Sequence, residues 1–181
     1  MGAAWPERRR LLIADLDPDA LVLELGCGEG CLLSLAQSRG MAAVGIDPSG
    51  AMLSRASKRA RNLVRADARH MPFADQTFHV VVASYPGPWI FEPETHREMA
   101  RVCRSNAEIR VLLGGDYQVG PGRRIRRWLA SGAYGGRALA DQRAALESRV
   151  SCSELSGVVE VRRDRWGTAL LWVASPTSKE H

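Results

Sequence analysis

The sequence predicts an α/β protein with a doubly wound, mostly parallel sheet that ends in an antiparallel β-hairpin. Strand-like and helix-like segments alternate from residue 20 to residue 113, the order expected when helices cover both faces of a parallel sheet. The run 78–83 (FHVVVA) is apolar at five of its six positions and contains three consecutive β-branched valines, as strands buried on both faces do. Segments 157–163 and 168–174 are joined by so short a turn that they must pair antiparallel.

The first element expected is a helix over residues 5–17 that covers the sheet. Pro6 suits a first helical turn, where its missing N–H would have no partner inside the helix. Leu11, Leu12 and Leu16 form an apolar stripe, and Asp17-Pro18 ends the helix.

A strand over 21–25 then runs into three glycines at alternate positions, Gly26, Gly28 and Gly30. Glycine permits positive φ and lets a ligand approach bare backbone, so this segment predicts a tight turn that holds a ligand. A helix over about 29–39 follows and stops at Gly40.

The strand–helix pattern repeats after Gly40. A strand over 42–46 leads into Asp47-Pro48-Ser49, and Ser49 can cap a helix over 50–60. The later elements expected are strands at 62–66 and 78–83, a helix at 92–103, a strand at 107–113, helices near 121–130 and 139–149, and the two hairpin strands.

Polar residues stand at the ends of successive strands. Glu24, Asp47, Asp67 and Ser84 each lie at or just after a strand end. In an open parallel sheet the ligand binds outside the carboxyl ends of the strands, so these four should face one crevice.

Composition fits one intracellular domain. The 181 residues are 45% hydrophobic, no run approaches the length of a membrane span, and no signal h-region is evident. We expect a cytoplasmic protein without a membrane partner. Cys27, Cys31, Cys103 and Cys152 are scattered, which favours reduced thiols, and we expect no metal site.

The spacing of the glycines separates two ligand classes. A dinucleotide-binding turn requires G-x-G-x-x-G, but Cys31 stands where the third glycine would be. This residue argues against a nicotinamide dehydrogenase. An acidic residue, Glu24, precedes the glycines instead. A carboxylate is a poor neighbour for a pyrophosphate and a good one for an ammonium group.

These residues resemble the class I S-adenosylmethionine-dependent methyltransferases, in particular the branch with small-molecule substrates. The segment 24–30 (ELGCGEG) looks like the first motif of that family, and 44–49 (VGIDPS) like its second. Ala66-Asp67-Ala68, followed by 71–78 (MPFADQTF), is similar to the third region. The resemblance implies a Rossmann-like fold, S-adenosylmethionine as cofactor and S-adenosylhomocysteine as product.

The resemblance also implies roles for individual residues. The methionine part of the cofactor would lie on Gly26, Cys27, Gly28 and Gly30, with Glu24 near its amino group. Asp47, followed by Pro48, would accept hydrogen bonds from both ribose hydroxyls. Asp67 would accept from the adenine amine, the Ala68 N–H would face a ring nitrogen, and the Ser84 carbonyl would face the methionine amine.

On this basis the chain is expected to be a single methyltransferase domain. Its parts would be a covering helix (1–19), a cofactor-binding core (20–113), a variable helical segment on the acceptor side (114–156), the hairpin (157–175) and a tail (176–181).

The loop 84–91 (SYPGPWIF) follows the fourth strand and should lie beside the transferred methyl group. Its aromatic residues could line an acceptor pocket, or Trp89 and Phe91 could pack under the next helix. In-line methyl transfer needs no dedicated catalytic residue. Candidate acceptor-side residues are Tyr85, Trp89 and His96, and His70 and Asp116 are further titratable groups near the expected mouth.

The net charge of +5 leaves other functions open. Arginines at 123, 124, 126 and 127 could bind RNA or protein and make the chain a methyltransferase of macromolecules. As a helix, the same segment would bury Ile125 and Trp128 and leave the arginines solvated, so a nucleic-acid partner is not favoured. A binding protein that kept the fold without catalysis is a further alternative. The sequence does not determine the oligomeric state.

Overall fold

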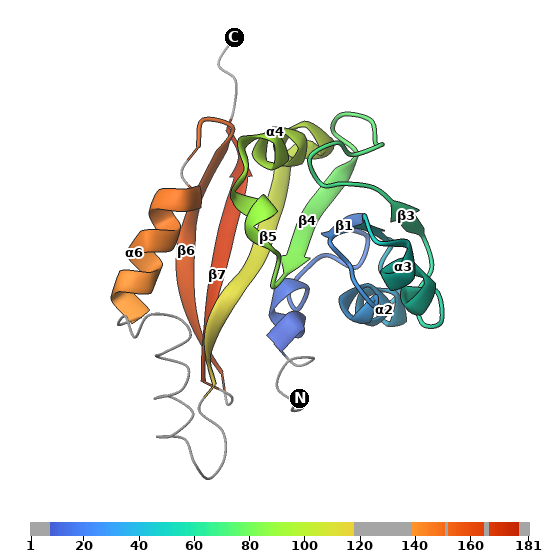
Figure 1. Ribbon diagram of the computed structural model, residues 1–181, viewed down its shortest axis with the longest axis horizontal. Helices are drawn as coiled ribbons and strands as arrows, with labels where there is room; N and C mark the ends of the chain where they lie inside the picture. Colours follow the sequence, from blue (N-terminus) through green and yellow to red (C-terminus); the bar gives the residue numbers. More distant parts are fainter. Residues whose placement is uncertain (1–7, 118–138, 151, 165–166, 178–181) are drawn as a thin grey trace.

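The structure is a computed structural model that describes residues 8–117, 139–150, 152–164 and 167–177. Seven strands form one sheet in the order β3-β2-β1-β4-β5-β7-β6 (Figure 1). Neighbouring strands from β3 to β5 pair parallel, whereas β5 and β7, and β7 and β6, pair antiparallel. The predicted fold class, a mostly parallel sheet that ends in an antiparallel hairpin, is confirmed.

Most elements lie where the sequence predicts them, but the helix expected over 50–60 ends at Ala56, and the strand expected over 107–113 spans Cys103–Tyr117. In chain order they are η1 (Arg10–Leu12), β1 (Val22–Leu25), α2 (Cys31–Ser38), β2 (Ala43–Asp47), α3 (Gly50–Ala56), β3 (Leu63–Arg65), β4 (Phe78–Ser84), η2 (Pro88–Phe91), α4 (Pro93–Val102), β5 (Cys103–Tyr117), α6 (Leu139–Val150), β6 (Leu155–Asp164) and β7 (Gly167–Pro176). The helix expected near 121–130 falls outside the described residues.

Both faces of the sheet are covered, because successive strand residues point to opposite sides. Leu23 and Leu25 of β1 pack in a core with η2, α4 and α6, whereas Val22 packs on the other face with η1 and α2. β4 alternates in the same way, with Val81 in the first core and Val82 in the second. This two-sided burial explains why the sequences of β1 and β4 are mostly apolar.

The N-terminal helical segment ends at Leu12, earlier than the expected residue 17. The Arg39 guanidinium, at the end of α2, donates to the carbonyls of Ile13 (2.9 Å) and Ala14 (3.2 Å). Leu12 and Ile13 are fully buried beneath it. Arg39 thus supplies hydrogen bonds to two carbonyls beyond the end of the helical segment, and it fixes this segment on the core.

Gly45 lets the glycine turn pack closely on β2. A Cβ at this position would lie 2.8 Å from Cδ2 of Leu33 and 3.0 Å from the Cβ of Cys27. Both neighbours are buried, so neither can move aside freely.

We therefore expect Gly45→Ala to lower the free energy of unfolding by about 1–3 kcal/mol through overpacking. Denaturant titration followed by circular dichroism would measure it. Gly114→Ala is the control, because a Cβ there meets nothing within 4 Å. Equal stabilities for the two variants would contradict the close packing at Gly45.

Candidate functional site

The carboxyl ends of β1, β2 and β4 are aligned at one edge of the sheet. Leu25, the last residue of β1, pairs with Ile46 of β2 on one side and with Ala83 of β4 on the other. Asp47 and Ser84 are the next residues of those neighbouring strands. The sheet thereby places the predicted residues Glu24, Asp47 and Ser84 around the glycine turn.

The glycine turn has the backbone conformation that its sequence predicts. Gly26, Gly28 and Gly30 have φ values of 62°, 54° and 74°, which L side chains rarely adopt. The Cys27 N–H donates to the Ile46 carbonyl at 2.9 Å, so the turn continues the pairing between β1 and β2. Two of the three glycines, Gly26 and Gly28, are only half-buried and leave backbone accessible to a ligand.

Asp47 connects the glycine turn to the start of α3. One carboxylate oxygen accepts from the Gly28 N–H and the other from the Ser49 N–H, both at 2.9 Å. Ser49 in turn caps α3 by accepting from the Met52 N–H. The carboxylate, 8% exposed, is held in one orientation, and each oxygen retains a lone pair for a further donor.

Glu24 is a buried carboxyl group with one oxygen left over. It is 2% exposed, and the backbone N–H of Leu33, in the first turn of α2, favours its charged form. Its Oε2 has no hydrogen-bond partner among the described residues. Burial raises the pKa of Glu24 to about 8, against the opposing charge of Arg9, while the charge of Asp47 raises it further. A buried acceptor without a donor is costly and points to a ligand that supplies one.

Asp67, two residues after β3, already has a cationic partner. Arg69 donates to it through its backbone N–H (2.9 Å) and twice through its guanidinium, at 2.9 and 2.6 Å. These contacts hold the pKa of Asp67 at about 2. Arg69 also reaches Glu92 at 3.3 Å. An adenine amine would share this carboxylate with Arg69, while the neighbouring Ala68 is buried.

The loop after β4 turns sharply at Tyr85, whose φ is 51°. Positive φ at a non-glycine residue costs energy and is concentrated at functional sites. The Tyr85 N–H donates to the Leu112 carbonyl at 2.8 Å, and its ring packs with the core beneath η1 and α2.

Trp89 lies over the glycine turn. A Cβ at Gly26 would be only 3.0 Å from Cζ2 of the Trp89 ring. The Thr95 hydroxyl donates to the Trp89 carbonyl at 2.8 Å and fixes η2 at the start of α4. The sequence left two interpretations open for Trp89, contact with the site and packing under the next helix. The ring lies over Gly26 and also packs against the core, so it has features of both.

His96 belongs to α4 and points into the core. It is 2% exposed, its Nε2 is 2.9 Å from the Ile90 carbonyl oxygen, and its ring centroid is 5.3 Å from that of Trp172. Burial lowers its pKa. These contacts make His96 a packing residue of the core. His70 is exposed beside Asp67, and the Asp116 side chain is not among those described.

The sequence interpretation missed Arg9. Its Nε lies 3.3 Å from the Ser84 hydroxyl, and its charge acts on the buried Glu24. Arg9 is 75 positions from Ser84 in the chain, and no motif links the two. Only the folding of the N-terminal segment onto the sheet brings this arginine to the crevice.

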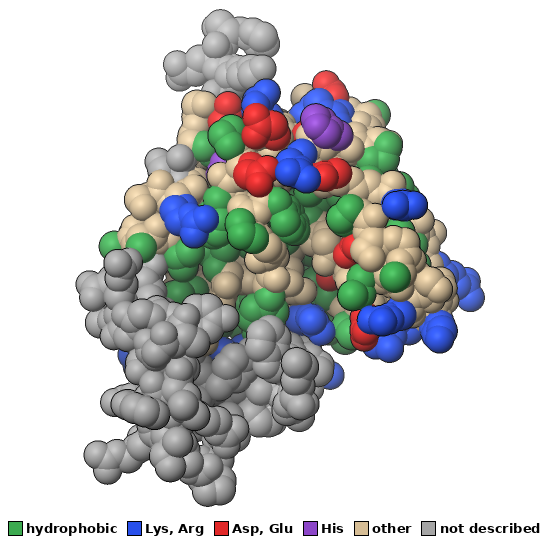
Figure 2. Space-filling model, in the orientation of Figure 1, with side chains coloured by type: hydrophobic (Ala, Val, Ile, Leu, Met, Phe, Trp, Pro, Cys, Tyr) green, Lys and Arg blue, Asp and Glu red, His purple; other side chains and the backbone are tan. Residues whose placement is uncertain are grey.

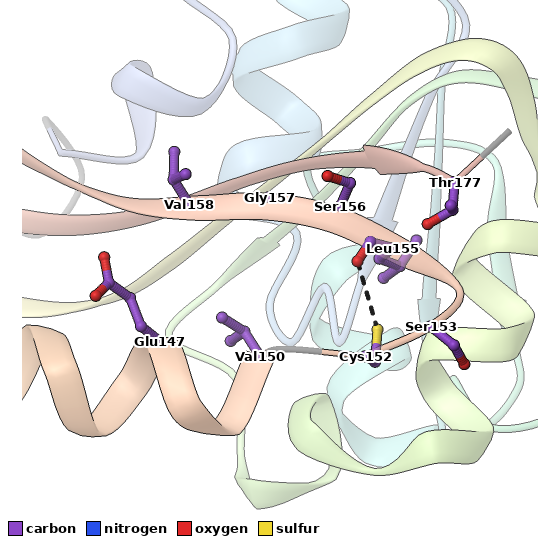
Figure 3. Close-up of a pocket in the computed structure, with 9 residues that line it drawn as sticks. All are labelled: Glu147, Val150, Cys152, Ser153, Leu155, Ser156, Gly157, Val158 and Thr177. Atoms are coloured by element: carbon purple, nitrogen blue, oxygen red, sulfur yellow. Dashed lines mark hydrogen bonds between the residues drawn. The ribbon is translucent and has the colours of Figure 1, made fainter.

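The rest of the described surface has a cavity and a face of charged side chains. A cavity of about 450 Å³ lies between α6 and β6, lined by Glu147, Cys152 and Val158 among others, and includes none of the strand-end residues (Figure 3). Charges of both signs alternate over α4, above hydrophobic side chains in the middle of the face (Figure 2). Within the described ranges, we find neither a metal-binding group of His, Cys, Asp or Glu nor a helix that could span a membrane. The arginine segment 123–127 falls outside those ranges.

In comparisons with known families and curated proteins, this chain is similar to methyltransferases. The family model of a methyltransferase domain matches residues 22–106. A phosphatidylethanolamine N-methyltransferase of Cereibacter sphaeroides is 37% identical over 118 residues, which are 60% of this chain and 58% of that protein. A demethylmenaquinone methyltransferase of Corynebacterium urealyticum is 33% identical over 108 residues, 59% of this chain and 46% of that one. The matched regions thus span only about half the length of these relatives.

Solved structures show the same fold at low identity. A Pyrococcus horikoshii protein superposes with a TM-score of 0.68 at 18% identity, and 97% of this chain and 93% of that chain are covered. A geranyl diphosphate methyltransferase in complex with S-adenosylmethionine gives a TM-score of 0.66 at 15% identity, with 96% and 85% covered. These similarities place the chain in the class I methyltransferase fold.

The raised pKa of Glu24 predicts a pH-dependent stability. An unfolded chain releases this proton near pH 4.5, whereas the folded protein retains it to about pH 8. Stability should therefore fall as pH rises from about 5 to about 8. Glu24→Gln removes this contribution, so its melting temperature relative to wild type should be higher at pH 8 than at pH 5, by roughly a few degrees.

Differential scanning calorimetry of the ligand-free protein at both pH values would measure this change. Glu29→Gln, at an exposed position of the same turn, is the control and should leave the pH dependence as it is in wild type. Parallel pH curves for wild type and Glu24→Gln would rule out a titrating Glu24.

Proposed function

We propose, from the premise that residues 22–106 belong to the methyltransferase domain family, that the chain binds S-adenosylmethionine and transfers its methyl group to a small-molecule acceptor. The observation that carries the proposal is the Oε2 of Glu24, which has no hydrogen-bond partner within the described part of the chain and lies beside a turn of three glycines. The pairing of a buried acceptor with accessible backbone suits the ammonium group and thioether chain of the cofactor's methionine part.

The residues present fit this cofactor along its whole length. The glycine turn would lie under the methionine part, with Glu24 and the Ser84 carbonyl facing the ammonium group. Asp47 would accept from the ribose hydroxyls with the lone pairs that Gly28 and Ser49 leave free. Asp67 and the Ala68 N–H would meet the adenine edge, with Arg69 sharing the Asp67 carboxylate.

When bound, S-adenosylmethionine supplies a sulfonium methyl group that a nucleophile can displace in line, leaving S-adenosylhomocysteine. The protein's part is alignment. Asp47 is fixed by two backbone hydrogen bonds, so it would set the ribose without reorganising. Trp89 lies over Gly26 and would exclude water from the methyl group and present an aromatic face to a positive charge. No general base is assigned.

The similarity to curated relatives supports a small-molecule acceptor with an apolar part. One relative is named for phosphatidylethanolamine and the other for demethylmenaquinone. Both names describe molecules with long apolar chains. The half-buried Trp89 would offer apolar surface to such an acceptor, whereas one face of the Phe91 ring is covered by the Arg149 guanidinium, 3.9 Å from the ring centroid.

Cofactor binding is the first test. Isothermal titration calorimetry with S-adenosylhomocysteine should show binding, and Asp47→Ala should weaken it by about 2 kcal/mol, because a charged hydrogen-bond acceptor is lost. Asp75→Ala, at an exposed loop position, is the control and should bind as wild type does. No binding by the wild type, or equal affinities for wild type and Asp47→Ala, would contradict the assignment of the ribose site.

Methyl transfer is the second test. Methyl-labelled S-adenosylmethionine would be incubated with phosphatidylethanolamine vesicles or demethylmenaquinone, and labelled product extracted. Trp89→Ala should lower kcat/KM at least about tenfold through lost alignment, while Trp89→Phe should retain most of the activity. Cofactor binding without transfer to any small acceptor would favour a binding protein, and transfer to RNA or protein alone would favour the macromolecular alternative.

A further inference from the structure

We propose that Arg9 binds the carboxylate of the cofactor's methionine part, so that a segment preceding the matched domain contributes to cofactor recognition. The inference rests on the proposed function. It concerns a residue outside residues 22–106, the range of the family model.

The charge of the site calls for a cation at this end of the ligand. A methionine part carries an ammonium group and a carboxylate about two bonds apart. Glu24 and Asp47 suit the ammonium group, but the charge of Asp47, and that of Glu24 once it ionises beside this group, would repel the carboxylate. Arg9 is the cation whose charge acts most strongly on Glu24, and it reaches Ser84 at the end of β4.

Arg9 also has free hydrogen-bonding capacity. Its Nε donates to the Ser84 hydroxyl at 3.3 Å, a long contact. Among the described residues, no carboxylate lies within 4 Å of its guanidinium, and neither Nη group has a hydrogen-bond partner. Other arginines near the crevice are already paired, Arg55 with Glu29 and Arg69 with Asp67. The two Nη groups of Arg9 therefore remain for a carboxylate.

The backbone that carries Arg9 is held in place. Arg39 anchors the Ile13 and Ala14 carbonyls, and Arg110 of β5 pairs with Asp15. The adjacent Leu12 is fully buried. Arg9 is half-buried, so its side chain is positioned by packing yet reachable from the crevice. Such preorganisation reduces the entropy lost when a ligand binds.

Three ligands separate carboxylate binding from a merely structural role. S-adenosylhomocysteine carries both charged groups, its decarboxylated analogue keeps the amine alone, and 5′-methylthioadenosine has neither. Calorimetry would compare wild type with Arg9→Gln and Arg9→Lys. Arg10→Ala, at the exposed neighbouring position, is the control.

We expect Arg9→Gln to weaken S-adenosylhomocysteine binding about tenfold or more, because a charged hydrogen-bonded pair is lost. Binding of the other two ligands should change less than about twofold, and Arg9→Lys should restore part of the affinity by returning the charge. Arg10→Ala should bind all three as wild type does. Melting temperatures of the variants would show that each is folded.

Two outcomes would overturn the inference. Equal losses for all three ligands would mean that Arg9 only holds the N-terminal segment, and unchanged affinities would mean that it does not meet the ligand. Failure of the wild type to bind any of the three would instead overturn the proposed function, and the inference with it.

Discussion

The Asp47 carboxylate is the contact on which the candidate site depends. It joins three parts of the chain: the end of β2, the glycine turn through Gly28, and the start of α3 through Ser49. Together with the bond from the Cys27 N–H to the Ile46 carbonyl, these two bonds fix the turn relative to the neighbouring strand end. The turn leads directly into α2, which begins at Cys31. A ligand that binds Asp47 would thus meet a preformed surface.

Two buried acidic residues at the site destabilise the ligand-free protein. Glu24 and Asp47 are both buried at adjacent strand ends, and burial together with the charge of Asp47 raises the pKa of Glu24. The Leu33 N–H and the charge of Arg9 offset only part of this cost. A positively charged ligand group between the strands would relieve the rest. The protein gives up stability here that a ligand would restore, which is a common property of binding sites.

Much of the fold could be predicted because secondary structure and burial depend on patterns of a few neighbouring residues. The apolar run 78–83, the glycines at 26–30 and the capping Ser49 each indicate their element through a pattern of a few residues, and the structure has those elements there. Helix ends were harder. The N-terminal helical segment stops at Leu12, and Arg39, distant in sequence, donates to the two carbonyls that follow it. A local pattern holds no information on such a partner.

The same distinction applies to the site. The sequence by itself determined the strand ends, the turn and the acidic residues that follow them, since each depends on neighbours within a few positions. Only the tertiary structure decided which side chains converge there. It put Arg9 beside Ser84, laid the Trp89 ring over Gly26 and buried His96 against Trp172. These contacts join segments far apart in the chain, and their formation depends on how helices and loops pack on the completed sheet, a property of the whole fold rather than of any one motif.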